Sequence, residues 1–412
     1  MEHAFEKHVS NMVAFYESGV HEHSQKLGVE LEWTLVHEDL SQVKFDEKFG
    51  QAWLMNAAKN TFPTEILDEN NNVIGVKNDR DSITLEPAGQ FELSAGPFDT
   101  LDEVFDTFSN FFVETNALVN PHGIKMIPIG YHPKCKAEEL VLIPKVRYQL
   151  MNEYFLKNSP LGIQMMRGTG STQVSIDYSS ESDCVRKLRL AYLCTPIFAL
   201  LTDNTPVFEG KKRTHHLMRT QVWENCDKNR CGVVHGLFGE NFNFETYAKH
   251  VLNTRAMFEM DGSAGHLTTK TTSEVYGEKQ MDFEACAHAS SHLFNDVRLK
   301  NFIEIRPADA LPTDVAVAYV ALIKGLFYSE TSLQKLEELF GEQNEDSIEK
   351  AKISLQAHGF DSKAYGKNVS DITNSLLDVA FTGLPSNEQH YLKPLQTIAE
   401  NKKTLADEAC PL

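Results

Sequence analysis

Residues 29–36 read Val-Glu-Leu-Glu-Trp-Thr-Leu-Val, and this run begins with apolar and acidic residues in strict alternation. Alternation with a period of two predicts a β-strand with one buried face, because successive side chains point to opposite sides of a sheet. Glu30 and Glu32 therefore project together, opposite their apolar neighbours. Three further segments repeat the arrangement: residues 90–93, 173–178 and 302–306.

Oxygen-bearing side chains dominate the polar sides of these segments and a nearby turn: Glu30, Glu32, Glu86, Gln90, Glu92, Asp177 and Glu304. Any one strand taken alone is explained more simply as a half-exposed strand that faces water. If the strands form one sheet, however, the carboxylates repel one another unless divalent cations or arginines neutralise them. Hard oxygen ligands without a convincing histidine site indicate Mg²⁺, or alternatively Mn²⁺, rather than zinc.

Magnesium held by a few carboxylates commonly serves nucleotide phosphates. The sequence contains neither a G-x-x-x-x-G-K-[ST] loop nor a G-x-G-x-x-G loop, so it lacks the motifs of a P-loop site and of a Rossmann site. We therefore expect metals and arginines on the sheet to hold any phosphate.

The domain organisation follows from a chain of 412 residues that has no internal repeat and no Pro/Gly/Ser-rich linker. We expect a catalytic domain over residues 1–328, which mix strand and helix signals, and a helical C-terminal extension over residues 329–412 packed on it. Two boxes of capping residues, at 100–103 and 180–183, each predict the start of a helix. The second helix is predicted to break near Pro196.

Charge and targeting signals narrow the possible partners. The 58 acidic residues exceed the 39 basic ones, which gives a formal net charge of −19 and a field that repels nucleic acid and anionic lipid. The first eight residues do not resemble a signal peptide, and the apolar run at 315–323 is too short to cross a bilayer. We expect a cytoplasmic protein, no nucleic-acid or membrane partner, and reduced thiols at its seven scattered cysteines.

Eight stretches, in order along roughly residues 28 to 330, resemble the motifs of one family, the plant-type and proteobacterial glutamate–cysteine ligases, which are related to glutamine synthetase in fold. They are residues 30–32, 86–94, 129–133, 144–148, 172–181, 218–223, 227–232 and 296–306. The resemblance implies an α+β, glutamine-synthetase-like fold. A curved, antiparallel-rich sheet would form the active-site floor, with helices behind it and a helical C-terminal tail.

The resemblance also implies roles for individual residues. The metal-site carboxylates would be Glu30, Glu32, Glu86, Glu92 and Glu304. Arg219 resembles the clamp for the α-carboxylate of the substrate glutamate, a role that suits its bidentate guanidinium. Trp223 and Gln173 would line the glutamate pocket. Arg230 and Arg306 would face the transferring phosphate of ATP, with Glu304 beside them at the catalytic centre.

Other readings of these residues remain open on the sequence alone. Arg219 and Arg230 could pair with surface acids, and Trp223 could be a core aromatic residue. His288 and His292, four residues apart, are better explained as a packed helical face than as a metal pair, because no third ligand accompanies them. The family pattern is also broken by glycines in residues 166–171, by Ala88 and by the proline in residues 306–310, which bears on substrate detail.

The implied activity is a Mg²⁺- and ATP-dependent ligation of glutamate to cysteine through γ-glutamyl phosphate, the first step of glutathione synthesis. Expected partners are these small molecules, and the protein would be a monomer or a homodimer. The alternatives are a γ-glutamyl ligase for another amine, a phosphotransferase similar to phosphagen kinases, and a non-catalytic binding protein.

Overall fold

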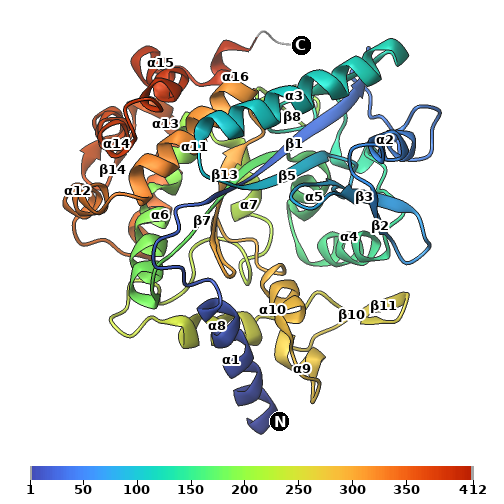
Figure 1. The fold of residues 1–412 in the computed structure, drawn as a ribbon, viewed down its shortest axis with the longest axis horizontal. Helices are drawn as coiled ribbons and strands as arrows, with labels where there is room; N and C mark the ends of the chain where they lie inside the picture. Colours follow the sequence, from blue (N-terminus) through green and yellow to red (C-terminus); the bar gives the residue numbers. More distant parts are fainter. Residues whose placement is uncertain (1, 410–412) are drawn as a thin grey trace.

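The computed structural model describes residues 2–409 and is built on a nine-stranded sheet whose strand pairs are antiparallel (Figure 1). Eight strands follow the order β12-β13-β7-β1-β5-β4-β3-β2, and β6 pairs with the far end of β1. Their bounds are β12 Val297–Leu299, β13 Ile303–Asp309, β7 Ser171–Ile176, β1 Leu27–His37, β5 Phe91–Phe98, β4 Ser82–Leu85, β3 Val73–Lys77, β2 Thr64–Leu67 and β6 Ile124–Ile127.

The four predicted strands lie side by side as β13, β7, β1 and β5, which confirms that they form one sheet. The register places Glu30 opposite Gln173 on one side, and Glu32 opposite Glu92 on the other. Directly opposed like charges destabilise a sheet. The polar face is therefore a site of electrostatic strain that another charge has to relieve.

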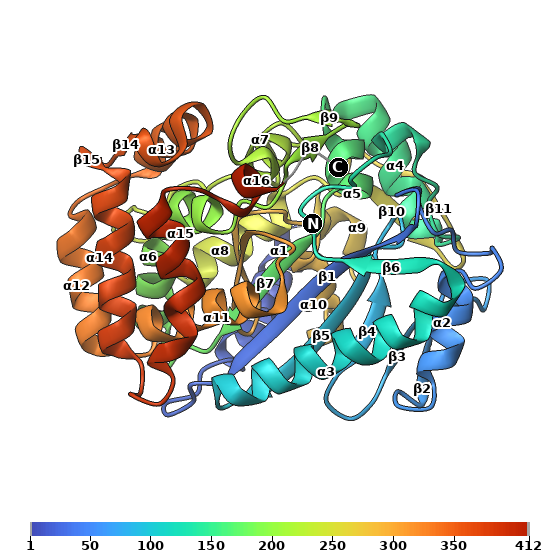
Figure 2. The ribbon, with the colours of Figure 1, turned by 90° about the horizontal axis from the view of Figure 1, so that it is seen from above.

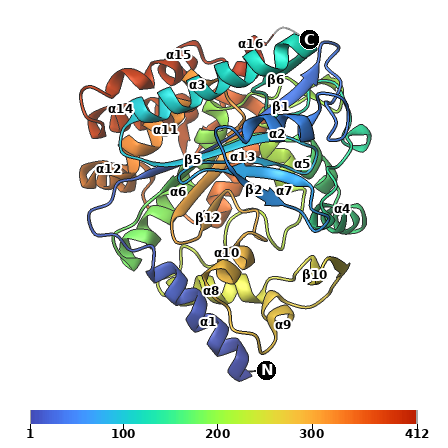
Figure 3. The ribbon, with the colours of Figure 1, turned by 45° about the vertical axis from the view of Figure 1, so that its right-hand side comes forward.

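The apolar face of the sheet is covered by helices. Helix α3 (Leu101–Val119) presents Phe111 to Trp33 of β1 with a ring separation of 5.4 Å. Helix α11 (Thr313–Phe327) is buried along its length apart from its first two residues, and α6 (Glu181–Leu201) packs near β13. Figure 3 shows α3 and α11 on the same side of the strands. The core thus lies between the sheet and these helices.

Both predicted helix starts are confirmed, but the predicted break at Pro196 is wrong. Thr100 caps α3 in a complete capping box, and Ser180 caps α6. Helix α6 continues through Pro196 to Leu201. Proline lacks the N–H that would bind the carbonyl of Tyr192, and the hydroxyl of Thr195 donates to that carbonyl instead, at 2.8 Å.

The C-terminal region is helical, as predicted, and packs on α11. Its helices are α12 Glu330–Phe340, α13 Glu345–His358, α14 Val369–Gly383, α15 Lys393–Asn401 and α16 Leu405–Glu408 (Figure 2). Helices α11 and α14 can approach closely at Gly325 because glycine has no side chain. A Cβ at this position would lie only 2.3 Å from the carbonyl oxygen of Ala380. The domain boundary near residue 328 stays a prediction.

The remaining elements lie around the sheet and in the C-terminal region. Below the sheet in Figure 1 lie α1 Glu2–Glu17, α8 Phe244–Asn253, α9 Thr272–Tyr276, α10 Phe283–Ser290 and the hairpin β10 Phe258–Asp261 with β11 Ala264–Leu267. Elsewhere are α2 Gln51–Ala58, α4 Val146–Asn158, α5 Gly162–Gly168, α7 Met218–Glu224, the pair β8 Val207–Phe208 and β9 Lys211–Lys212, and the pair β14 Lys363–Ala364 and β15 Lys367–Asn368. Within residues 2–409, every helix is too short or too polar to cross a membrane.

Candidate active site

A cavity of about 310 Å³ lies on the polar face of the sheet, and a volume of this size suits small-molecule substrates. The sheet supplies its floor, while α4, α5, α7 and the segment 291–298 supply its walls. The predicted residues that line it are Glu30, Glu32, Glu86, Glu92, Gln173, Arg219, Trp223 and Arg306, together with Gln90. The tertiary structure therefore brings most of the predicted site residues together.

The four glutamates of the floor resist ionisation. Burial raises the pKa of Glu30, Glu86 and Glu92, and the charges of neighbouring glutamates raise the pKa of Glu30 and Glu92 further. Burial and the charge of Glu86 raise the pKa of Glu32 to about 7. Cations nearby, chiefly Lys145 and Arg147 for Glu86, act in the opposite direction. The floor is therefore a cluster of carboxylates whose ionisation needs additional positive charge.

Hydrogen bonds hold this floor in place. Glu32 accepts from the backbone N–H of Ser171 at 3.0 Å and from its hydroxyl at 2.6 Å. The side-chain amide of Gln90 donates to the carbonyl of Thr169 at 2.9 Å. Glu92 accepts from the hydroxyl of Thr84 at 3.0 Å. These contacts orient the carboxylates without neutralising them.

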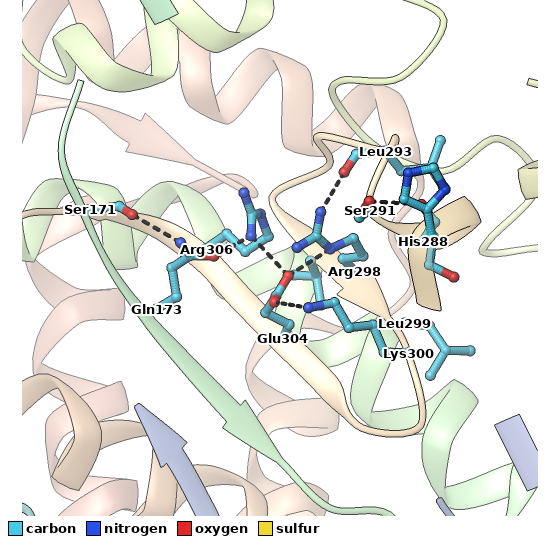
Figure 4. A network of polar contacts seen from close by, with 12 residues as sticks. Ser171, Gln173, His288, Ser291, Leu293, Arg298, Leu299, Lys300, Glu304 and Arg306 are labelled. Atoms are coloured by element: carbon cyan, nitrogen blue, oxygen red, sulfur yellow. Dashed lines mark hydrogen bonds and ion pairs between the residues drawn. The ribbon is translucent and has the colours of Figure 1, made fainter. Parts of the chain in front are cut away.

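Glu304 is surrounded by three cationic side chains (Figure 4) and is not among the residues that line the cavity. Its carboxylate contacts Arg298 at 2.7 Å, Lys300 at 2.8 Å and Arg306 at 2.9 Å, and the residue is fully buried. Burial alone would raise its pKa, but the three cations outweigh burial and hold the pKa well below its usual range. Glu304 is thus the ionised anchor for the cationic side of the site.

Arg219, Arg306 and Trp223 form one wall. The guanidinium of Arg219 lies 4.7 Å from the ring centre of Trp223, and that of Arg306 lies 5.7 Å away. Arg219 donates to the carbonyl oxygens of Gly170 and Arg306 only at 3.5 and 3.3 Å. Such long bonds are weak, so the guanidinium of Arg219 retains donors for an anionic ligand. Arg306 also donates to the side-chain oxygen of Gln173.

Arg230 does not line the cavity. It is fully buried behind it, where it donates to Asp227 at 2.6 Å, to the carbonyl of Arg255 at 2.9 Å and to the carbonyl of His292 at 3.1 Å. The predicted contact of Arg230 with a transferring phosphate would require these bonds to break, and it stays a prediction.

Three cations of the cavity had no role assigned from the sequence: Lys145, Arg147 and Arg298. Lys145 and Arg147 lie at the start of α4, and Arg147 donates to the hydroxyl of Ser291 at 3.2 Å. All three fall inside stretches that resemble the family motifs. That resemblance was the available signal, but strand alternation could not reveal residues that reach the cavity from a helix and a loop.

Asp177 and the pair His288 and His292 do not line the cavity and make contacts within the protein. Asp177 lies just past the end of β7, where it accepts from the N–H of Lys26 at 2.9 Å. The ring of His288 on α10 packs against that of His292 at 4.8 Å. Among the residues that the structure describes, no group of three or more His, Cys, Asp or Glu side chains is arranged to hold a metal ion. The floor glutamates nevertheless fit Mg²⁺ in donor chemistry, since they are hard oxygen ligands whose ionisation a dication would favour.

Comparison with known proteins assigns the chain to a protein family. The sequence model of "Glutamate-cysteine ligase family 2 (GCS2)" matches residues 26–409. The chain belongs to this family. Its relatives in this glutamate–cysteine ligase family include the chloroplastic glutamate–cysteine ligase B of Oryza sativa subsp. japonica, which is 29% identical over 90% of this chain and 76% of the relative. The chloroplastic glutamate–cysteine ligase of Arabidopsis thaliana is 30% identical over 84% of this chain and 67% of the relative.

A solved structure also aligns with this family member. The glutamate–cysteine ligase of Francisella tularensis in complex with AMP covers 92% of this chain and 82% of its own, with 10% identity and a TM-score of 0.49.

Proposed function

We propose that this chain joins the γ-carboxylate of glutamate to the amine of cysteine, with ATP as the phosphoryl donor. The observation that carries the proposal is the family match across residues 26–409, which includes every residue of the cavity. The relatives' names, glutamate–cysteine ligase, supply both substrates. ATP is supported by the mixture of carboxylates and cations in one cavity, which suits a polyanion that binds with a metal.

The chemistry explains why such a cavity is needed. A carboxylate does not condense with an amine in water, because its oxygen is a poor leaving group. Transfer of the γ-phosphoryl group of ATP to the γ-carboxylate of glutamate gives γ-glutamyl phosphate, whose phosphate departs when the amine attacks the carbonyl carbon. Positioning and charge stabilisation supply the acceleration, so no covalent bond to the protein is required.

Arg219 is proposed to bind the α-carboxylate of glutamate, with Trp223 and Gln173 beside it. A planar guanidinium whose own protein contacts are long can form two parallel hydrogen bonds with a carboxylate. Arg306 is proposed to face the phosphoryl group in transfer. Its place beside Glu304 keeps it charged, because that carboxylate raises the pKa of Arg306 against the effect of burial.

Glu30, Glu32, Glu86 and Glu92 are proposed to hold Mg²⁺, or Mn²⁺ in its place. A bound dication would supply charge neutralisation for the phosphates. Glu304 was predicted as a fifth ligand, and its three cationic partners would have to yield part of its carboxylate for that role. Because burial raises the pKa of these floor glutamates, a bound dication would favour their ionised form.

The test is product identification. Purified protein is incubated with ATP, Mg²⁺, glutamate and a panel of amines, while ADP release is followed and products are identified by mass spectrometry. We expect γ-glutamylcysteine as the main product. ADP release that does not depend on glutamate would contradict the proposal, and a γ-glutamyl product formed only with another amine would contradict cysteine as the acceptor.

The substitution Arg219→Lys tests the proposed role of Arg219 directly, because lysine keeps the positive charge but cannot form two parallel hydrogen bonds with a carboxylate. We expect the KM for glutamate to rise by about tenfold or more, with the KM for ATP little changed. Arg189→Lys is the matched control, since Arg189 lies near the middle of α6, does not line the cavity and donates to the carbonyls of Leu237 and Gly239.

A further inference from the structure

Helix α7 carries two residues of the proposed glutamate pocket, Arg219 and Trp223, yet it has little local support. It is only seven residues long, and no side chain caps its N-terminus. Leu217, which precedes it, lies in the left-handed region at φ 53°. Short helices are marginal by themselves. The position of α7 therefore depends on tertiary contacts.

Helix α13 of the C-terminal region contacts the α7 segment at both ends. The carbonyl of Gln356 accepts from the N–H of His216 at 3.1 Å, just before α7 begins. Lys352 reaches the other end, where its Nζ lies 2.5 Å from the carboxylate of Glu224, the last residue of α7. A helix far along the chain thus braces one wall of the active site.

Lys352 makes a second ion pair, with Asp296. Its Nζ lies 2.5 Å from Oδ2 of Asp296, and the lysine side chain is only 3% exposed. A buried ammonium stays charged only when it is paired. The two carboxylates raise the pKa of Lys352 although burial acts against them. Lys352 is therefore a permanent countercharge for Asp296.

Asp296 lies next to the arginines proposed to bind substrate anions. Arg219, Arg306 and Asp296 line a second, small cavity, which shares both arginines with the main one. The carbonyl of Asp296 accepts from the N–H of Arg306 at 2.8 Å. The negative charge of Asp296 acts to raise the pKa of Arg219, against the effect of burial. A carboxylate at this position competes with substrate for the guanidinium of Arg219 unless another cation holds it.

We infer that Lys352 is a positioning residue that holds Asp296 away from Arg219, so that the guanidinium of Arg219 stays available to the substrate glutamate. The inference rests on the proposed function, in which Arg219 binds the α-carboxylate of glutamate. It makes the C-terminal region part of the working site, because the restraining charge comes from α13. Loss of this restraint should weaken the binding of glutamate, because glutamate is the substrate that Arg219 is proposed to bind.

Glutamate binding to the full-length chain tests this inference through calorimetric Kd values and steady-state KM values. In Lys352→Met, we expect the Kd and the KM for glutamate to rise by about tenfold or more, because Asp296 would then pair with Arg219. The KM for ATP should change by less than about threefold. Lys350→Met is the matched control, because Lys350 is exposed on the same helix.

A second substitution separates positioning from general support. Adding Asp296→Asn to Lys352→Met removes the competing carboxylate, and we expect glutamate affinity to return to within about threefold of wild type. A purely structural lysine gives no such recovery, so failure of the double variant to recover would overturn the inference. Asp296→Asn alone should bind glutamate at least as tightly as wild type, and a weakening of about tenfold would also overturn it, whether or not Lys352→Met folds.

The wild-type measurement distinguishes the two levels of the proposal. A wild-type chain that binds no glutamate refutes the proposed function and the inference with it. A wild-type chain that binds glutamate no more tightly than folded Lys352→Met refutes the inference alone.

Discussion

Replacement of Glu32 by glutamine is expected to stabilise the metal-free protein while abolishing turnover. Glu32 lies in the cavity floor opposite Glu92, and its pKa moves from 4.5 to about 7 through burial and the charge of Glu86. Glutamine has nearly the same shape and no charge. The substitution therefore removes the repulsion and keeps the packing.

The magnitude follows from proton linkage. Because the folded pKa lies above the unfolded one, the folded state binds more protons between pH 4.5 and about 7, and wild-type stability falls as pH rises through that window. A difference from 4.5 to about 7 corresponds to about 3 kcal/mol at pH 8. Glutamine loses one of the two hydrogen bonds from Ser171, which costs about 1 kcal/mol. The net gain is about 2 kcal/mol at pH 8 and about zero at pH 5.

Urea denaturation followed by circular dichroism, at pH 8 and pH 5 without divalent ions, measures the effect. Glu38→Gln, at an exposed position just past the end of the same strand, is the matched control and should leave stability unchanged at both pH values. A Glu32→Gln protein less stable than wild type at pH 8 would refute the reasoning. An equal gain at both pH values would also refute it, because repulsion between ionised carboxylates disappears in acid.

Two buried charges give further predictions. Glu304→Ala leaves three cations without their shared carboxylate. We expect the free energy of unfolding to fall by about 3–5 kcal/mol and turnover to be lost. An unchanged urea midpoint would argue against stabilisation by these three ion pairs. Arg230→Met leaves Asp227 buried and unpaired, and we expect a similar loss of stability with the KM for ATP retained in the folded protein. An increased KM for ATP at unchanged stability would instead place Arg230 at the phosphate.

The local sequence was sufficient for the four strands that carry the polar face and for two helix starts, but not for the course of α6. Alternation in residues 29–36 predicted a strand with Glu30 and Glu32 on one face, because the side-chain period of a strand is a property of neighbouring residues. The capping box at Thr100 predicted the start of α3 for the same reason, since a cap joins residues three apart. Motif resemblance then identified the family.

Long-range contacts decided the rest. Strand pairing set Glu32 opposite Glu92, and the hydroxyl of Thr195 binds the carbonyl that Pro196 leaves without a donor in α6. Buried contacts with Asp227 and His292 hold Arg230 outside the lining of the cavity. Lys352 reaches the active-site wall from a helix that the sequence marked only as an appendage. Periodicity and capping act over a few residues, whereas the pairing of charges from distant segments depends on the folded backbone. Alternation could therefore predict the glutamates of the floor, but it could not predict the ion pairs that Lys352 makes with Glu224 and Asp296.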